Sequence, residues 1–392
     1  MSASRALPVV ELAGTGRQRG EAHGESLREL VLTAVDRWSA NVLGRAPLDA
    51  DAYLTELVDN SGFRRAMNQY APDLAAEVSG IAAASGTDER LVLGLNLMDE
   101  EWWLREVMRG DRRLHHCTSV ARCASDSEPT LVAQNMDLPA WLDGLQVLLD
   151  VSPVGDGSAR ALVPSHAGMI GLNALNEHGV GIAVNALPQL PVSANGLPVA
   201  FVIRLLASAR DLASATAMAQ QIRHASGQNY TIGGRDGAVS LECSAAGATR
   251  YHPGGQTIVH SNHPLASGVP VARSDGDTSQ LPPHERNSID RLQHASTWLA
   301  DQPVTVRSLQ QMLCEPPVLR GRNGDDGFSF YGVVMECSDN PALWMTPGTP
   351  GPPGEHEFAH RALASSKSLA PARPPDGDCG AAFERGSSGA VG

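Results

Sequence analysis

The chain has 392 residues, of which 42% are hydrophobic and 19% are charged, so we expect a globular protein with room for two or three domains. Its formal net charge of −13 argues against nonspecific binding to nucleic acid and against adhesion to anionic membranes. No apolar run is as long as a bilayer-spanning helix, and the first residues lack the apolar stretch of a secretory signal, so we expect a cytoplasmic protein.

The N-terminal part of the chain is predicted to be mainly helical. A short strand is expected first, over residues 7–12, and apolar residues at helical spacing then predict a helix over 25–43. A second helix should begin at Pro72, with proline in its first turn, and end at Gly86. A third helical segment is predicted over 89–108.

From residue 117 onward the pattern changes to short β-like runs separated by pairs of helices. Turns at Asn176–Gly179 and Arg235–Gly237 predict antiparallel hairpins, and Asp211 is expected to cap a helix. The predicted strands cover residues 130–136, 145–151, 159–163, 168–173, 180–187, 229–234, 238–243, 257–260, 328–337 and 342–346. The predicted helices cover residues 197–208, 211–224, 287–301 and 304–314.

Antiparallel hairpins separated by helix pairs predict two packed sheets with helices outside them, an α+β layered architecture. We expect three parts. They are a mainly helical segment over 1–116, a catalytic core over 117–364, and a tail over 365–392 that is too poor in apolar residues to order itself.

The most informative position is Cys117, at the junction between the helical and the strand-forming parts. A nucleophile at such a junction predicts a precursor that cuts itself between His116 and Cys117. Attack of the thiol on the carbonyl of His116 would give a thioester, which water opens. An unperturbed α-amine titrates at about 7.7–8.0 and a thiol at about 8.5, so the freed amine of Cys117 can serve as the base for its own thiol.

The alternative for Cys117 is an inert buried cysteine. The six cysteines form no CxxC pair, which argues against a zinc ribbon or a thioredoxin-like site. In a reducing compartment most of them should be small buried thiols.

Several motifs follow one another in an order and at a spacing that resemble a known family. They are Cys117–Ser119, Gln134–Asp137, Asn176–Leu187 and His260–His263, and before them Gly20–Leu27 and Glu77–Ala82. Over residues 15–350 the chain resembles the acyl-CoA:6-aminopenicillanate acyltransferase (isopenicillin-N acyltransferase) family of N-terminal-nucleophile hydrolases. The resemblance implies an αββα sandwich of two antiparallel sheets flanked by helices. It also implies cleavage before Cys117, and amide or acyl-transfer chemistry with neither a cofactor nor a metal.

The resemblance also implies roles for four further residues. Asp137 matches the aspartate that hydrogen-bonds and orients the terminal amine. Asn229 matches the asparagine that donates to the oxyanion, and Asn185 matches a second asparagine near the oxyanion site of choloylglycine hydrolases. Arg291 resembles the arginine that supports the site electrostatically, with Arg286 as its competitor. The alternatives are a solvated strand-end aspartate, asparagines that bond to the local backbone, and surface arginines.

The leading functional hypothesis is an autoprocessed N-terminal-cysteine amidohydrolase that cleaves a small acylated amine or amino-acid amide through a thioester. The alternatives are an acyl-CoA-dependent N-acyltransferase, an unprocessed cysteine hydrolase with His115, His116 or His263 as its base, and a non-catalytic binding protein. We interpret His260 and His263 as strand-end structure, because no carboxylate or cysteine accompanies them at metal-ligand spacing.

The expected partners are small molecules, either an acyl amide or an acyl-CoA together with an amine. Neither nucleic acid nor a membrane is expected. The two cleaved fragments should stay associated as a heterodimer, since separation would expose their shared core, and further oligomerisation stays open. Trp102, Trp103 and Trp141 are near the nucleophile in sequence and are candidates for lining the substrate site.

Overall fold

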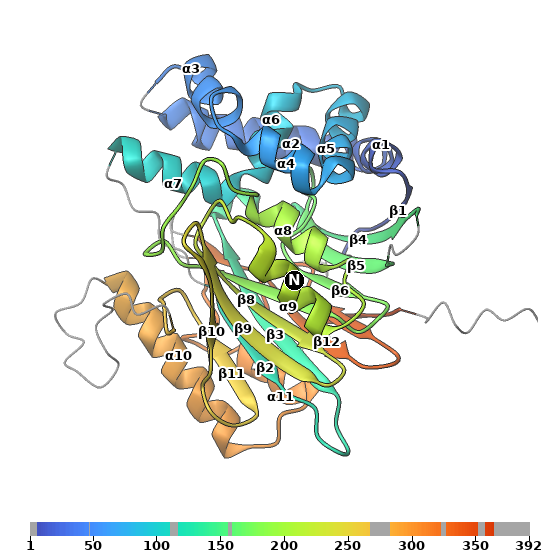
Figure 1. Cartoon of the computed structure of the whole chain (residues 1–392), viewed down its shortest axis with the longest axis vertical. Coiled ribbons are helices and arrows are strands. Elements are labelled where there is room, and N and C mark those ends of the chain that lie inside the picture. Colours follow the sequence, from blue (N-terminus) through green and yellow to red (C-terminus); the bar gives the residue numbers. More distant parts are fainter. Residues whose placement is uncertain are drawn as a thin grey trace, which may run out of the picture.

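The computed structural model describes residues 6–46, 48–109, 117–155, 159–266, 283–322, 327–351 and 357–363 (Figure 1). The predictions that concern His115, His116 and the tail over 365–392 lie outside these residues. Within them, every helix is too short or too polar to span a lipid bilayer.

The strands form two sheets. Their bounds are β1 Val9–Gly14, β2 Thr118–Arg122, β3 Thr130–Leu138, β4 Gln146–Pro153, β5 Ala161–His166, β6 Ala174–Asn176, β7 Gly181–Ala186, β8 Gln228–Gly234, β9 Gly237–Ser244, β10 Gly247–Tyr251, β11 Thr257–His260, β12 Phe328–Cys337, β13 Ala342–Met345 and β14 Ala359–Ala362. In the described residues the larger sheet has eight strands in the order β1-β4-β5-β6-β7-β8-β9-β10. The smaller has six, in the order β11-β2-β3-β12-β13-β14.

The helices fall into two groups. Those before Cys117 are α1 Gly16–Ser26, α2 Arg28–Asn41, α3 Ala50–Leu54, α4 Phe63–Tyr70, α5 Pro72–Ser85, α6 Glu89–Asn96 and α7 Met98–Arg109. Those after it are α8 Val199–Leu206, α9 Leu212–Gln221, α10 Pro283–Asp301 and α11 Val306–Leu313. The first group gathers at one end of the two sheets, at the top of Figure 1.

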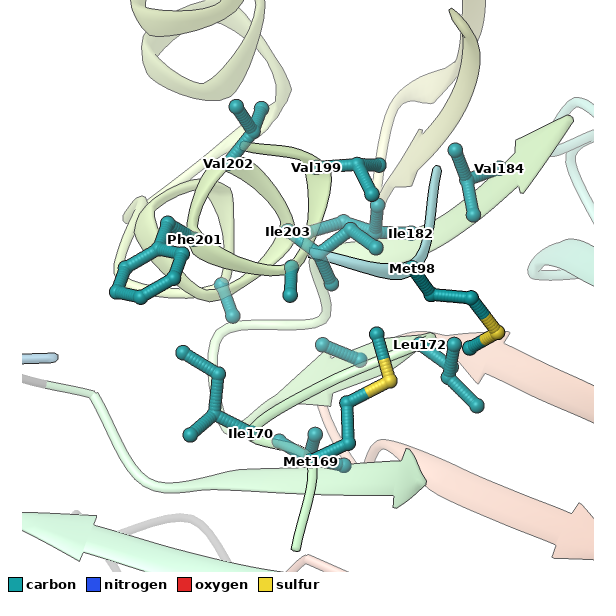
Figure 2. Packing of buried hydrophobic residues seen from close by; sticks show 14 of the residues in the cluster. Met98, Met169, Ile170, Leu172, Ile182, Val184, Val199, Phe201, Val202 and Ile203 are labelled. Atoms are coloured by element: carbon teal, nitrogen blue, oxygen red, sulfur yellow. The ribbon is translucent and has the colours of Figure 1, made fainter. Parts of the chain in front are cut away.

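The second group supplies the outer layers. Helix α9 packs on β8 and β9 of the larger sheet, and α10 and α11 pack on β2, β3, β11 and β12 of the smaller one. Figure 2 shows Val199 and Ile203 of α8 facing Ile182 of β7, with Met98 from the start of α7 beside them. The sheets pack face to face through β2, β3, β7 and β8. The expected α+β class, with two sheets between helices, is therefore confirmed.

One edge of the larger sheet differs from the expected antiparallel pattern. Strand β1 pairs in parallel with β4, with Val9 opposite Leu148 and Gly14 opposite Pro153. The strand predicted over 7–12 therefore exists, and the N-terminal segment contributes it to the sheet of the core.

Local sequence signals explain several boundaries. Helix α5 has Pro72 in its first turn and ends at Gly86, whose φ of 77° is readily adopted by glycine. Asp211 caps α9 through a hydrogen bond from the N–H of Ser214, as predicted. The segment predicted over 89–108 is instead two helices with a break at Leu97. The break lets the consecutive residues Leu97 and Met98 both enter the core.

Three other predictions were incomplete or wrong. Residues 168–173 form turns rather than a strand, and it is β6 that pairs with β7 across the predicted turn. The helix predicted over 25–43 begins only at Arg28, because the preceding residues belong to α1, which a Thr15–Gln18 capping box starts. Strand β10 was missed because its mostly exposed residues show no alternation of burial.

Candidate active site

Cys117 lies directly before β2, with 6% of its surface exposed. Its Sγ is 3.8 Å from Sδ of Met136 and 4.0 Å from the backbone oxygen of Asp137. Burial raises the pKa of the thiol to about 12, and the charge of Asp137 adds to this while Arg291 opposes it. In the uncut chain the thiol is therefore protonated at neutral pH.

Asp137 is buried near the end of β3, on the strand that pairs with β2. Its Oδ1 accepts a hydrogen bond of 2.7 Å from Oγ of Ser329, whereas Oδ2 is buried without a partner among the described residues. The register of β12 shifts between Ser329 and Tyr331, and Ser329 lies opposite Asp137 at that irregularity. Burial raises the pKa of Asp137 to about 7, with Arg291 and the Ser329 bond opposing it.

Arg291, on α10, is 1% exposed and contacts the main chain of Cys117. Its Nη1 donates to the backbone oxygen of Cys117 at 2.5 Å and to Oγ1 of Thr118 at 2.8 Å. Its Nη2 donates to Oδ1 of Asn262 at 3.0 Å. Burial lowers the pKa of Arg291 to about 10, so the guanidinium stays cationic at neutral pH. Of the two arginines that the sequence left open, Arg291 is the one that the structure brings to Cys117.

Asn185 and Asn229 are partners in the β7–β8 register and are fully buried. Nδ2 of Asn229 donates to Oδ1 of Asn185 and to Oγ1 of Thr231, both at 3.1 Å. Oγ of Ser119 also donates to Oδ1 of Asn185, at 2.6 Å. The two asparagines are thus connected to β2 at the second residue after Cys117. Among the described residues, their side-chain amides form hydrogen bonds within this network and with the backbone oxygen of His260, and none with the thiol.

The two histidines of the 260–263 motif take part in other bonds. Nε2 of His260 is 3.0 Å from Oε1 of Glu242, and Nδ1 of His263 is 2.8 Å from Oγ of Ser288. Burial lowers the pKa of His263 to about 4. Among the described residues no three His, Cys, Asp or Glu side chains come together as a metal site would require.

A pocket lies beside these residues, between α7 and the ends of β7 and β8. Its lining includes Asp99, Trp102, Trp103, Pro188, Val192 and Gln228. Ala186 and Gln228 both line it, so the pocket adjoins Asn185 and Asn229, which are their neighbours in the chain. Trp102 and Trp103 are two of the three tryptophans expected to line the site. The third, Trp141, belongs to a short 3₁₀ helix, Ala140–Leu142, and is not part of this lining.

Sequence reasoning missed Ser329, Asn262 and Asp99. Asn262 lies inside a motif quoted above, but nothing in the sequence connects it to an arginine on α10. Ser329 becomes a partner of Asp137 only through the register of β12. Asp99 precedes the two tryptophans by one helical turn, and this spacing is the signal that could have identified it.

Solved structures that are similar to the chain include the following three. Two variants of conjugated bile acid hydrolase from Clostridium perfringens are each 12% identical, with 64% of this chain and 93% of theirs covered and TM-scores of 0.38 and 0.39. Penicillin V acylase from Agrobacterium tumefaciens is 13% identical, with 58% and 82% covered and a TM-score of 0.35. Among curated protein sequences, none matches the chain.

A family comparison covers the region after the nucleophile. Residues 124–314 match the family described as acyl-coenzyme A:6-aminopenicillanic acid acyl-transferase. The match begins beyond Cys117 and includes Asp137, Asn185, Asn229 and Arg291. It confirms the resemblance of this chain to the acyl-coenzyme A:6-aminopenicillanic acid acyl-transferase family and, with it, the expectation that the chain is an enzyme.

Proposed function

We propose that the chain is an autoprocessed amidohydrolase whose nucleophile is Cys117, and that it cleaves a small acylated amine or amino-acid amide through a thioester. The observation that supports this best is the position of Cys117 between two buried charged groups. Arg291 binds its carbonyl oxygen, the backbone oxygen of Asp137 lies 4.0 Å from its thiol, and Oδ2 of Asp137 is unpartnered among the described residues.

Processing begins with the thiol of Cys117 attacking the carbonyl carbon of His116. The C–N bond between the two residues breaks, the acyl group passes to sulfur, and the nitrogen takes up the thiol proton. Water then hydrolyses the thioester and restores the thiol. The product carries a free α-amine on Cys117.

Processing also changes the electrostatics of the thiol. In the uncut chain no positive charge lies on Cys117 itself, and burial together with Asp137 holds the thiol pKa high. After cleavage the α-ammonium adds a positive charge on the same residue, and Oδ2 of Asp137 is the acceptor that we assign to it. Because a nearby cation favours the thiolate, the thiol pKa falls and a nucleophile forms.

In turnover the thiolate attacks the amide carbonyl of the substrate, and the ammonium of Cys117 gives its proton to the departing amine. The α-amine then acts as a base for water, which hydrolyses the thioester and frees the acid. We assign stabilisation of the oxyanion to the side-chain amide of Asn229, with Asn185 holding it. Arg291 positions Cys117 by fixing its carbonyl oxygen.

Acyl transfer is the second candidate, because the matched family is named for an acyl-CoA-dependent reaction. Here an amine rather than water accepts the acyl group from sulfur. The unprocessed hydrolase with His263 as its base has less support, because Nδ1 of His263 is engaged by Ser288 and burial lowers the pKa of the ring.

The heterodimer of cleaved fragments is part of the proposal and is supported by contacts across the cleavage point. Strand β1 pairs with β4, and Glu77 of α5 forms ion pairs with Arg19 of α1 and Arg204 of α8. The β1–β4 pairing and the Glu77–Arg204 ion pair join the segment before Cys117 to the segment after it.

Denaturing mass spectrometry of the purified protein tests the proposal. We expect two fragments, one ending at His116 and one beginning at Cys117, and a single uncut species for Cys117→Ala. Free thiol release from an acyl-CoA, measured with and without an added amine, separates transfer from hydrolysis. One continuous wild-type chain whose Cys117 does not react with iodoacetamide would rule the proposal out.

A further inference from the structure

Helix α7 is fixed on the catalytic sheet at its first residue. Figure 2 shows Met98 among the side chains of Ile182, Val184 and Val199, which come from β7 and α8. Met98 is 3% exposed. The next residue of the helix, Asp99, is therefore held near the end of β7 and the start of β8, where the pocket lined by Ala186 and Gln228 lies.

Asp99 and Glu100 form a pair of neighbouring carboxylates. Oδ1 of Asp99 accepts 2.9 Å from Nε2 of Gln228, and Oε1 of Glu100 accepts 2.8 Å from Oγ of Ser226. Oε2 of Glu100 is buried without a partner, and within the described residues neither carboxylate forms an ion pair. Glu100 is buried and Asp99 is half-buried, so without a cation beside them the two groups are costly to ionise together.

The pair therefore carries about one negative charge near neutral pH. Burial raises the pKa of Asp99 to about 6. Burial, with the charge of Asp99 adding to it, raises the pKa of Glu100 to about 8. Asp99 is then the ionised member, and it is also the member that lines the pocket.

The rest of the pocket suits an organic cation. Trp102 and Trp103 contribute indole rings, which attract ammonium and guanidinium groups, while Pro188 and Val192 contribute apolar surface. No lysine, arginine or histidine is among the described residues that line it. A carboxylate in the same place would meet the charge of Asp99 without any compensating cation from these residues.

We propose that this pocket binds a positively charged nitrogen group of the substrate and that Asp99 is the residue that selects it. The substrate class is then an amide that carries an ammonium or guanidinium group in the part seated beside α7. A substrate cation provides an opposite charge beside Asp99, which accepts a hydrogen bond from the uncharged amide of Gln228, in a pocket that adjoins Asn185 and Asn229. The inference rests on the proposed function, because it takes Cys117 as the reacting group.

Binding without turnover tests the inference independently of the chemistry. Isothermal titration of full-length Cys117→Ala would use three probes of similar shape, namely phenethylammonium, the neutral phenethyl alcohol and the anionic 3-phenylpropionate. We expect phenethylammonium to bind at least about tenfold more tightly than the alcohol, equivalent to about 1.4 kcal/mol, and 3-phenylpropionate to bind most weakly. Asp99→Asn in this background should remove the preference. Asp236→Asn, an exposed turn residue of the same charge, should keep it.

A second measurement covers the possibility that Asp99→Asn alters the fold. Lowering the pH from 7.5 to 5 protonates Asp99 and Glu100, while phenethylammonium keeps its charge. Its affinity for the Asp99-containing chain should then fall toward that of the alcohol, whose own affinity stays constant. Glu106 also lines the pocket, so Glu106→Gln shows whether it shares the effect.

Two results would overturn the inference: equal affinity for all three probes, or a preference for phenethylammonium that survives Asp99→Asn in a folded protein. Because Cys117→Ala performs no turnover, failure of the proposed function leaves these results unchanged. In the active enzyme the same selectivity should appear in kcat/KM for paired cationic and neutral amides.

Discussion

Arg291 donates a hydrogen bond of 2.5 Å from Nη1 to the backbone oxygen of Cys117, although 174 positions separate the two residues in the chain. The same guanidinium holds Oγ1 of Thr118 and Oδ1 of Asn262. It therefore joins α10, the turn after β11 and the start of β2 at the residue proposed to be the nucleophile. Each of these bonds restricts the orientation of Cys117.

We predict that Arg291→Met reduces processing by at least about tenfold, because it leaves the Cys117 carbonyl unheld and removes a buried cation. Arg291→Lys should recover only part of the loss, since an ammonium cannot reproduce the planar guanidinium that donates to four acceptors. The fraction of cut chain over time, followed by denaturing electrophoresis, measures this. Arg286→Met, on the same helix, is the matched control, and equal loss in both variants would contradict the role of Arg291.

Asp137→Asn should lower turnover by about 10²–10⁴-fold, the range typical of losing a positioned proton-transfer partner. The amide can still accept the hydrogen bond from Ser329, but it no longer offers a negative oxygen to an α-ammonium. Steady-state rates of the processed variant measure the effect, with Asp236→Asn as the charge-matched control. Full activity in Asp137→Asn would mean that the carboxylate has only a structural role.

Most of the layered fold could be predicted because local sequence patterns indicate the hairpins and the helix pairs. Pro72 and Gly86 bound a helix by their own backbone preferences, and Asp211 caps one by its side chain. Strand β14 and helices α3 and α4 were not predicted. Strand β14 is mostly exposed, so its residues give little burial alternation.

The glycines of the N-terminal motifs show what a resemblance alone leaves unexplained. A Cβ on Gly20 of α1 would lie 2.0 Å from the backbone oxygen of Glu77, and one on Gly80 of α5 would lie 2.6 Å from that of Arg17. The two helices therefore pack backbone to backbone at these positions. The motifs were visible in the sequence, but their contact depends on the tertiary structure.

Individual residues of the site could be predicted only where they match a position of the family that the sequence resembles. The Ser329 bond to Asp137 depends on an irregularity in the register of β12, which no local pattern specifies. Likewise, the hydrogen bond that Arg291 donates to Asn262 joins α10 to the turn after β11. These two elements are brought together by the packing of α10 on β11. Contacts of this kind follow from the assembled layers.

The stability of the uncut chain should fall as the pH rises from 6.5 to 8. The folded-state pKa of Glu100 is about 8, above its ordinary value, so the fold favours its protonated form. That contribution is complete below the unfolded pKa and is lost as the pH rises toward 8. Between pH 6.5 and 8, the titration of Glu100 alone should lower the free energy of unfolding by about 2 kcal/mol.

Other groups also titrate in this window, so the contribution of Glu100 is read from the difference between variants. Burial raises the pKa of Asp137 to about 7, which adds to the fall. Burial lowers the pKa of His23, His166 and His263 to about 4, and loss of the remaining protons from these rings in the unfolded chain opposes the fall. Thermal unfolding of Cys117→Ala at several pH values measures the trend. Glu100→Gln should reduce the fall relative to the parent chain, and the exposed Glu56→Gln should not. An unchanged slope in Glu100→Gln would contradict the assignment.

Glu77 should be the side chain whose loss most weakens the association of the two proposed fragments. It is fully buried on α5, and its carboxylate accepts hydrogen bonds from Arg19 of α1 at 2.8 Å and from Arg204 of α8 at 2.7 Å. The pairs with both arginines hold its pKa below the ordinary range despite burial. Glu77→Gln removes the charge and leaves two buried guanidinium groups undercompensated.

Breaking a buried ion pair from one side costs about 3–5 kcal/mol. We therefore expect Glu77→Gln to lower the denaturant midpoint of the uncut Cys117→Ala chain strongly. In the processed protein it should also release fragments in size-exclusion chromatography at denaturant concentrations that leave wild type associated. Glu21→Gln is the control, because the Arg17–Glu21 pair is exposed and should be worth less than about 1 kcal/mol. If the Glu77 variant and the control have the same denaturant midpoint, the buried ion pairs do not hold the fragments together. The pairing of β1 with β4 and the shared apolar core are then the remaining contacts that can hold them.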